Sequence, residues 1–187
     1  AASDVYKRQT NTFPSWDLAQ PFRTLAHNGE INTLKGNINW MKIHEQDMSS
    51  SLFKNVIDLK PVIRSTSDSG ALDNVFELLV HSGKLAPLIK LMMIPDAWSK
   101  RSKTVPKNHQ DLFNFLNSTI EPWDGPAAIC ATDAKWVLAS SDRNGLRPLR
   151  YTITSDNLFF AGSESGMIKI PEENIIEKGK LGPGQII

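Results

Sequence analysis

The sequence predicts an α+β fold, in which helices cover one face of an antiparallel sheet. Apolar residues recur at helical spacing through much of the first 120 residues, and short β-like runs separated by turn residues follow from residue 127. The 187 residues, of which 40% are hydrophobic, are enough to bury the core of one domain. No internal repeat or linker divides the sequence.

Four helices are expected in the first part of the chain. The first begins after Asn32, a candidate N-cap, and the second lies between Ser69 and Gly83, where the glycine is a natural stop. The other two run from Leu85 to Ile94 and from His109 to Ile120, and a proline soon after each of them prevents the helix from continuing.

The second part of the chain changes to the shorter period of β-strands. Strands are expected at Ala127–Thr132, Trp136–Ser140, Arg150–Thr154 and Leu158–Ala161. Turn residues separate these runs, so together they predict an antiparallel meander. The last apolar run, Gln185–Ile187, looks like a strand that stops midway, which suggests that the chain is a fragment.

Charge and composition exclude several classes of partner. The 21 Lys and Arg residues nearly balance the 20 Asp and Glu residues, and neither sign forms a long block, so no nucleic-acid or membrane-surface binding is expected. No apolar run approaches the ~18 residues that span a bilayer. The single cysteine, Cys130, cannot form an internal disulfide. These features predict a reduced, cytoplasmic protein whose ligand is a small molecule.

The densest polar signal lies at residues 24–32, where a short apolar strand runs into Asn28-Gly29 and then into a helix. The side-chain amide of Asn28 beside the unshielded N–H of Gly29 could form an oxyanion hole for acyl transfer. The alternative is an ordinary Asn-Gly turn, and spacing alone favours that alternative.

A second polar cluster, Ser65–Ser69, precedes the strongly amphipathic second helix. Capping of that helix by Asp68 or Ser69 explains the cluster and is the preferred interpretation from the residues alone. The functional alternative is that the carboxylate of Asp68 binds an ammonium group of a ligand.

Cys130 is a tempting nucleophile, but its context argues against that role. It lies in the apolar run 127–131 without a basic neighbour, which is typical of a core cysteine with an unreactive thiol. The four histidines show no ligand spacing with one another or with Cys130, so no metal site is expected.

Residues 142–149 join two expected strands and are unusually rich in charge for a turn. One interpretation is a solvated hairpin, which Asn144-Gly145 would explain. The other is a rigid, hydrogen-bonded corner that supports a site, with Arg147 placed by Pro148. The residues alone do not decide between them.

Five motifs follow one another along the chain: Thr10–Trp16, His27–Asn32, Ser67–Ser69 with Ala71–Asn74, Pro122–Ala128 and Asp142–Leu149. Together they resemble the class II glutamine amidotransferase domain of glutamate synthase large subunits. The resemblance runs from Thr10 to Ile187, and it favours the functional interpretations of Asn28-Gly29 and Asp68.

The resemblance implies an N-terminal-nucleophile hydrolase fold, a four-layer α/β/β/α sandwich, here incomplete at the N-terminus. It implies hydrolysis of L-glutamine to glutamate and ammonia, which is passed on to 2-oxoglutarate. The nucleophile would be the first residue of the mature chain, a cysteine whose α-amino group acts as base. By motif position, Asn28 and Gly29 would form the oxyanion hole, Asp68 would bind the substrate α-amino group, and Thr10 and Asn11 would line the pocket.

Two departures from the family pattern concern the first residues. The nucleophilic cysteine should lie upstream of Thr10, so this fragment is expected to be inactive by itself. Residues 1–9 do not match and are a candidate foreign segment; Lys7-Arg8-Gln9 stand where the family has Arg-Phe-Ser. The family arginine grips the substrate carboxylate, and its replacement by Lys7 or Arg8 is left open, because a bidentate grip depends on a guanidinium group at the right position.

The resemblance also implies partners and cofactors. No cofactor is expected in residues 10–187, whereas FMN and an iron–sulfur cluster are implied for the full-length protein. The remaining synthase domains of the same polypeptide, and an electron-donating small subunit or ferredoxin, are the implied protein partners. The main alternative is a non-catalytic binding or assembly domain of the same fold. An asparagine synthetase-like protein is disfavoured by residues 11–16.

Overall fold

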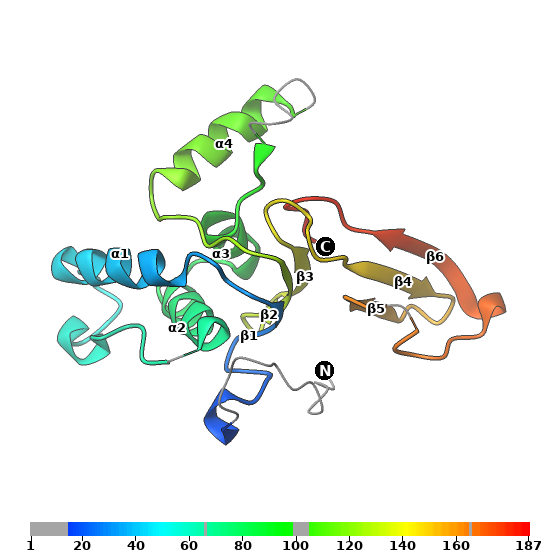
Figure 1. Ribbon diagram of the computed structural model, residues 1–187, viewed down its shortest axis with the longest axis horizontal. Coiled ribbons are helices and arrows are strands. Elements are labelled where there is room, and N and C mark those ends of the chain that lie inside the picture. Colours follow the sequence, from blue (N-terminus) through cyan, green and yellow to red (C-terminus); the bar gives the residue numbers. More distant parts are fainter. Residues whose placement is uncertain (1–14, 66, 99–104, 165) are drawn as a thin grey trace.

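The computed structural model describes residues 15–65, 67–98, 105–164 and 166–187. They form an α+β structure, as predicted, with helices and two small antiparallel sheets. Figure 1 shows the first sheet in the middle of the molecule, with the helices gathered on one side of it and the second sheet extending from the other. Thr10, Asn11, Lys7 and Arg8 lie outside the described residues.

The four predicted helices are confirmed, with shifts at their ends. They are α1 (Leu34–Asp47), α2 (Asp68–His81), α3 (Ala86–Met93) and α4 (Lys107–Asn117). Short 3₁₀ turns occur at Trp16–Leu18, Val56–Leu59 and Glu172–Asn174.

The cap of α2 corrects one prediction. The side chain of Ser67 accepts a hydrogen bond from the backbone N–H of Gly70 at 3.0 Å, so Ser67 is the N-cap rather than Asp68 or Ser69. Asp68 therefore begins the helix itself, where its negative charge is favoured by the helix dipole. The residue before α1 is Thr33, one position after the predicted cap Asn32.

The strands divide between two sheets. The first sheet contains β1 (Leu25–Gly29), β2 (Ala127–Thr132) and β3 (Val137–Ser141) in the order β1-β2-β3. The second contains β4 (Arg150–Thr154), β5 (Phe159–Gly162) and β6 (Ile175–Lys180) in the order β5-β4-β6. The predicted single meander is therefore wrong, because the chain changes sheets at the corner formed by residues 142–149.

The end of the chain adds a short pairing to the first sheet. Ile187 and Ala139 exchange two backbone hydrogen bonds of 2.9 Å, and Ile186 lies opposite Ser140. The strand-like character predicted for Gln185–Ile187 is thus confirmed as a bridge at the edge of β3.

Apolar residues cover both faces of the first sheet. One cluster packs α2 and α3 against it and includes Leu72, Val75, Phe76, Ile89, Met93, Leu25, Ile129 and Leu138. A smaller cluster lies on the opposite face and joins Ala128 and Ala139 to Leu149, Leu181 and Tyr151. Because successive strand residues point to opposite faces, His27 faces the helices while Asn28 faces the second sheet.

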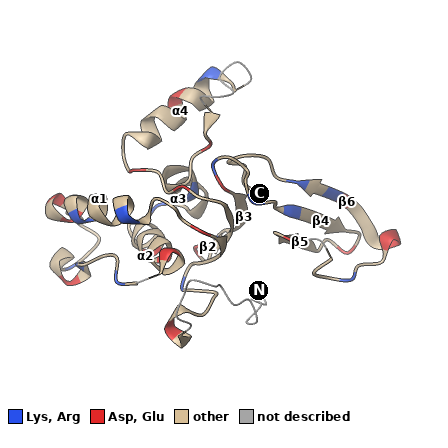
Figure 2. Ribbon diagram, viewed as in Figure 1, with Lys and Arg blue, Asp and Glu red and all other residues tan. Residues whose placement is uncertain are grey.

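Figure 2 shows residues of both charge signs on α1, on α4 and in the region of the second sheet. This distribution agrees with the balanced composition, which lacks a block of one sign. Among the described residues, no helix has the length and apolar character needed to cross a bilayer.

Candidate functional site

Gly29 ends β1 at a very close approach of two backbone segments. Its φ is +149°, and a Cβ atom there would lie 1.8 Å from the carbonyl oxygen of Pro126. Gly125 meets the carbonyl of Glu30 in the same way, since its Cβ would lie 1.9 Å from that oxygen. The alternative of an ordinary Asn-Gly turn is therefore wrong: both residues belong to a strand, and a side chain at position 29 would collide with backbone.

Asn28 points from β1 toward the second sheet. Its Nδ2 donates a hydrogen bond of 2.6 Å to Oγ of Ser163, which directly follows β5. The next residue, Glu164, lies 3.6 Å from the guanidinium of Arg147. Sequence analysis missed Ser163, because no local pattern marks a serine that is 135 residues away from its partner.

Asp68 reaches the chain just beyond Gly29. Its Oδ2 accepts a hydrogen bond of 2.8 Å from the backbone N–H of Ile31, and its side chain is 13% exposed. The structure thus brings Asp68 to the chain just after the end of β1. Asp68 approaches from the helix layer, whereas the amide of Asn28 lies on the side of the second sheet.

His27 is buried between these two parts of the site. Its Nδ1 lies 2.7 Å from Oγ of Ser69 and 4.0 Å from Oδ2 of Asp68. Sequence analysis considered His27 only as a metal ligand, and the contact with Ser69 could not be read from a local motif. Among the residues that the structure describes, no group of His, Cys, Asp and Glu could hold a metal ion.

Asp73 ties α2 to the beginning of β1. One of its carboxylate oxygens accepts hydrogen bonds from the backbone N–H groups of Thr24 at 2.9 Å and Leu25 at 3.1 Å, and from the Thr24 hydroxyl at 2.7 Å. The carboxylate is buried, and these donors compensate for its lost hydration. This residue therefore fixes where β1 begins relative to α2.

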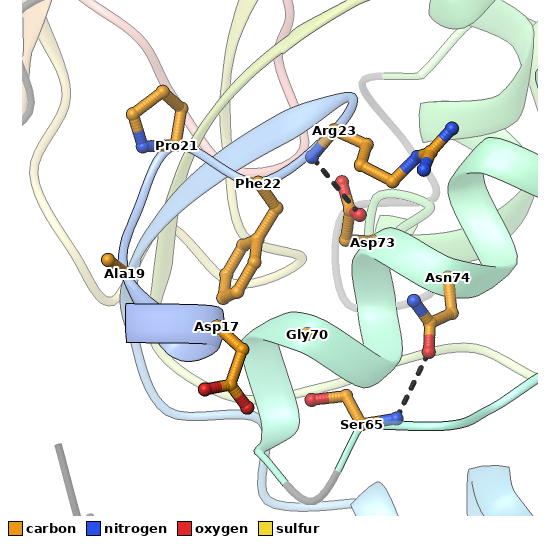
Figure 3. Close-up of a pocket in the computed structure, with 9 residues that line it drawn as sticks. All are labelled: Asp17, Ala19, Pro21, Phe22, Arg23, Ser65, Gly70, Asp73 and Asn74. Carbon is orange, nitrogen blue, oxygen red and sulfur yellow. Dashed lines mark hydrogen bonds between the residues drawn. The ribbon is translucent and has the colours of Figure 1, made fainter. Parts of the chain in front are cut away.

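A cavity of about 340 Å³ lies between residues 17–23 and the first turns of α2. Figure 3 shows it between the segment that carries Asp17, Phe22 and Arg23 and the helix face that carries Gly70 and Asp73. Neither Asn28, Gly29 nor Asp68 lines it. Of its polar groups, the N–H of Arg23 donates to the Asp73 carboxylate at 3.4 Å and the N–H of Ser65 donates to the Asn74 side chain at 3.1 Å.

Cys130 is exposed, so the prediction of a core cysteine is wrong. It pairs with Ala26 and Ala139 in the register of the first sheet, and the neighbouring pair is Asn28 with Ala128. Cys130 therefore shares a sheet face with Asn28. Partial loss of water around the sulfur nevertheless raises the pKa of its thiol, which disfavours the nucleophilic thiolate.

The corner at residues 142–149 is rigid and hydrogen-bonded. Asp142 is fully buried, and its carboxylate accepts backbone hydrogen bonds from Ala127 at 3.1 Å and from Asn144, Leu146 and Arg147 at 2.9 Å each. This arrangement rules out the solvated hairpin and supports the alternative interpretation.

A buried lysine lies behind this corner. Nζ of Lys90 donates a hydrogen bond of 2.6 Å to the carbonyl of Gly184, whose N–H in turn donates to the Asp142 carbonyl at 2.7 Å. Burial lowers the pKa of Lys90 to about 7, and Asp96 and Asp142 partly oppose that shift. Lys90 thereby connects α3 to the corner and to the C-terminal segment.

The family model for glutamine amidotransferases of class II matches residues 5–187. The chain belongs to this family. The predicted resemblance is confirmed, and the α+β architecture fits it. The relatives of this amidotransferase chain are glutamate synthases. It is 59% identical over 180 residues to "Glutamate synthase [NADPH] large chain" of Azospirillum brasilense, an alignment that covers 95% of this chain and 12% of the relative.

Two further relatives have different electron donors in their names. The chain is 49% identical over 180 residues to "Glutamate synthase [NADH]" of Saccharomyces cerevisiae, covering 95% of this chain and 8% of that protein. It is 45% identical over 188 residues to "Ferredoxin-dependent glutamate synthase" of Antithamnion sp., covering 98% of this chain and 12% of that protein. The amidotransferase chain thus spans about a tenth of the length of these relatives.

Proposed function

We propose that this chain is part of the glutaminase domain of a glutamate synthase and takes part in hydrolysing L-glutamine to glutamate and ammonia. The observation that carries the proposal is the end of β1, where the strand holds the amide donor Asn28 next to Gly29 and the Asp68 carboxylate of α2 binds the backbone N–H two residues farther on. Membership of the amidotransferase family and the names of the relatives support the same function.

The proposed role of Asn28 and Gly29 is to stabilise the oxyanion that forms when the substrate amide is attacked. The side-chain amide of Asn28 is an uncharged hydrogen-bond donor, which is the kind of group that stabilises an oxyanion. Gly29 has no side chain to shield its N–H. Neither role depends on a charged residue.

The proposed role of Asp68 is to bind the α-amino group of glutamine. Its carboxylate offers about four lone-pair directions, so the bond to Ile31 leaves room for an ammonium donor. Thr10 and Asn11 complete the proposed pocket by motif position.

The proposed nucleophile is a cysteine outside these 187 residues. Its thiolate sulfur forms a bond to the amide carbon of glutamine, and its α-amino group transfers a proton to the departing nitrogen as the C–N bond breaks and ammonia leaves. Water then attacks the thioester, which releases glutamate and restores the thiol. In this scheme the chain described here supplies the binding and electrostatic groups, and by itself it is inactive.

The same proposal extends to the whole protein. Ammonia would aminate 2-oxoglutarate in the remaining synthase domains, which would also bind FMN and an iron–sulfur cluster and receive electrons from a small subunit or ferredoxin. A cluster is held by several cysteines, and this chain has one, so its residues do not fit that group. The proposal also includes the four-layer sandwich, which is supported by the packing of α2 and α3 on one face of a sheet. A cytoplasmic location is a further part of the proposal.

The decisive experiment compares two nitrogen sources in a full-length synthase that contains these residues. Asn28→Ala should lower kcat with glutamine by roughly 10²–10³ while synthase activity with free ammonia is retained, because ammonia bypasses amide hydrolysis. Equal losses with both sources would contradict the oxyanion role. A full-length protein that binds glutamine without releasing ammonia would instead indicate the alternative, a non-catalytic binding or assembly domain.

A further inference from the structure

Besides the apolar contacts of the core, polar contacts join α2 to β1 and its flanking residues at three positions along the strand. Asp73 holds the beginning of the strand, Ser69 contacts its middle and Asp68 contacts the chain just after its end. Helix and strand therefore run in opposite directions with a polar contact near each end and one between them. Such contacts have strict geometry, whereas apolar packing is non-directional.

The contact between Ser69 and the middle of β1 is buried and lies next to the proposed site residues. His27 and Ser69 are each only 4% exposed, and His27 Nδ1 lies 2.7 Å from Ser69 Oγ. His27 immediately precedes Asn28, and Ser69 immediately follows Asp68. This hydrogen bond therefore joins the direct neighbours of two residues that are proposed to hold opposite ends of the same substrate.

A displacement at this contact would change the distance between the two groups. Asn28-Gly29 is fixed to β2 by strand pairing, and Asp68 is fixed to the beginning of α2. The hydrogen bonds of Asp73 hold the helix at the beginning of β1, and the contact of His27 with Ser69 holds it next to Asn28 and Asp68. Catalytic groups need placement within about 0.5 Å, which apolar packing does not guarantee by itself.

We propose that His27 and Ser69 are positioning residues, which hold the Asn28-Gly29 segment in register with Asp68 through their shared hydrogen bond. The inference rests on the proposed glutaminase function. Neither side chain contacts the substrate, and both act by setting the distance between groups that do. Ser69 also lies 3.4 Å from Oδ1 of Asp68, so its hydroxyl is in reach of both partners.

Ser69→Ala in the full-length synthase tests the proposal. Removal of the hydroxyl breaks the hydrogen bond to His27 Nδ1, so the Asn28-Gly29 segment is held less accurately relative to Asp68. The value of kcat/KM for glutamine should therefore fall by about tenfold or more. Activity with free ammonia should be unchanged. The measured quantity is the ratio of glutamine-dependent to ammonia-dependent activity, with KM and kcat for glutamine determined separately.

Val75→Ala is the matched control, because Val75 is a buried residue of the same helix whose truncation loosens packing without removing a polar contact. We expect this variant to leave the activity ratio unchanged. An unchanged ratio in Ser69→Ala, or an equal change in Val75→Ala, would overturn the positioning role.

Two parallel variants separate this inference from the function on which it rests. Asn28→Ala and Asp68→Asn should both lower the activity ratio if the glutaminase site is correctly placed. If they lower it and Ser69→Ala does not, only the positioning role fails. If none of the three changes the ratio, the proposed site itself is wrong.

Discussion

At the scale of single residues, position 29 requires glycine for a structural reason, the nearby backbone of Pro126, in addition to its proposed part in the site. The carbonyl of Pro126 occupies the space of a Cβ atom, and the φ of +149° is a conformation that L side chains rarely adopt. Gly29→Ala should therefore destabilise the chain by about 3 kcal/mol through steric overlap and backbone strain. Urea unfolding of the chain measures this change.

Gly36 is the matched control for that substitution. It lies within α1, and a Cβ atom there would meet nothing within 4 Å. Gly36→Ala should stabilise the chain by roughly 0.5–1 kcal/mol because alanine has the higher helix propensity. Similar effects of the two substitutions would show that the contact with Pro126 is not constraining.

Asp68 makes a backbone contact that can be separated from its charge. In Asp68→Asn the side-chain oxygen can still accept from Ile31, but the negative charge is gone. KM for glutamine in the full-length enzyme should rise about 10–100-fold, with a smaller effect on kcat, since the ammonium contact exists in ground and transition states alike. Steady-state kinetics over a range of glutamine concentrations would detect this, and an unchanged KM would remove Asp68 from the substrate site.

At the scale of elements, periodicity predicted α2, β2 and β4 well because each has a clear apolar pattern bounded by turn or cap residues. It missed β6, whose last four residues read Glu-Lys-Gly-Lys and show no apolar alternation. That strand is specified by pairing with β4, which is a long-range contact. Local motifs likewise marked Asn28 and Asp68 as candidates, but not Ser163 or the contact of Ser69 with His27, because these depend on segments that meet only in the folded chain.

The contact of α3 with the corner predicts a pH dependence of stability. The pKa of Lys90 is about 7 in the folded chain and 10.5 when unfolded, so between these values the unfolded chain binds more protons. Folding stability at this site therefore increases as pH rises from about 7 toward 10.5, and the cost of burying the charge is fully present below 7.

Lys90→Met provides the comparison, because the methionine has no proton to release. The free energy of unfolding of the unsubstituted chain, minus that of Lys90→Met, should increase between pH 7 and pH 10. Other groups that titrate in this range cancel in the difference. Urea unfolding at several pH values gives both quantities, and a difference that stays constant would show that Lys90 keeps its ordinary pKa.

At the scale of the whole molecule, the 187 residues contain much of the proposed binding machinery. Their single cysteine, Cys130, has a raised pKa and is therefore a poor nucleophile. The purified chain should therefore release no ammonia from glutamine above the rate without protein. Because Cys130 shares a sheet face with Asn28, Cys130→Ala is the necessary control. Release that disappears in this variant would make Cys130 the nucleophile, and release that persists would reveal another one.

The corner that the chain turns at Asp142 also has a kinetic consequence. Gly184 lies in a loop, yet its N–H is bonded to the Asp142 carbonyl and its carbonyl to buried Lys90. Loop amides commonly exchange their hydrogen for deuterium quickly, through small local fluctuations. The Gly184 amide can do so only when its bond to Asp142 breaks, which requires the C-terminal segment to separate from the corner. Its exchange rate should therefore match that of core-strand amides such as Ile129, so that one irregular position reports on the opening of the whole domain.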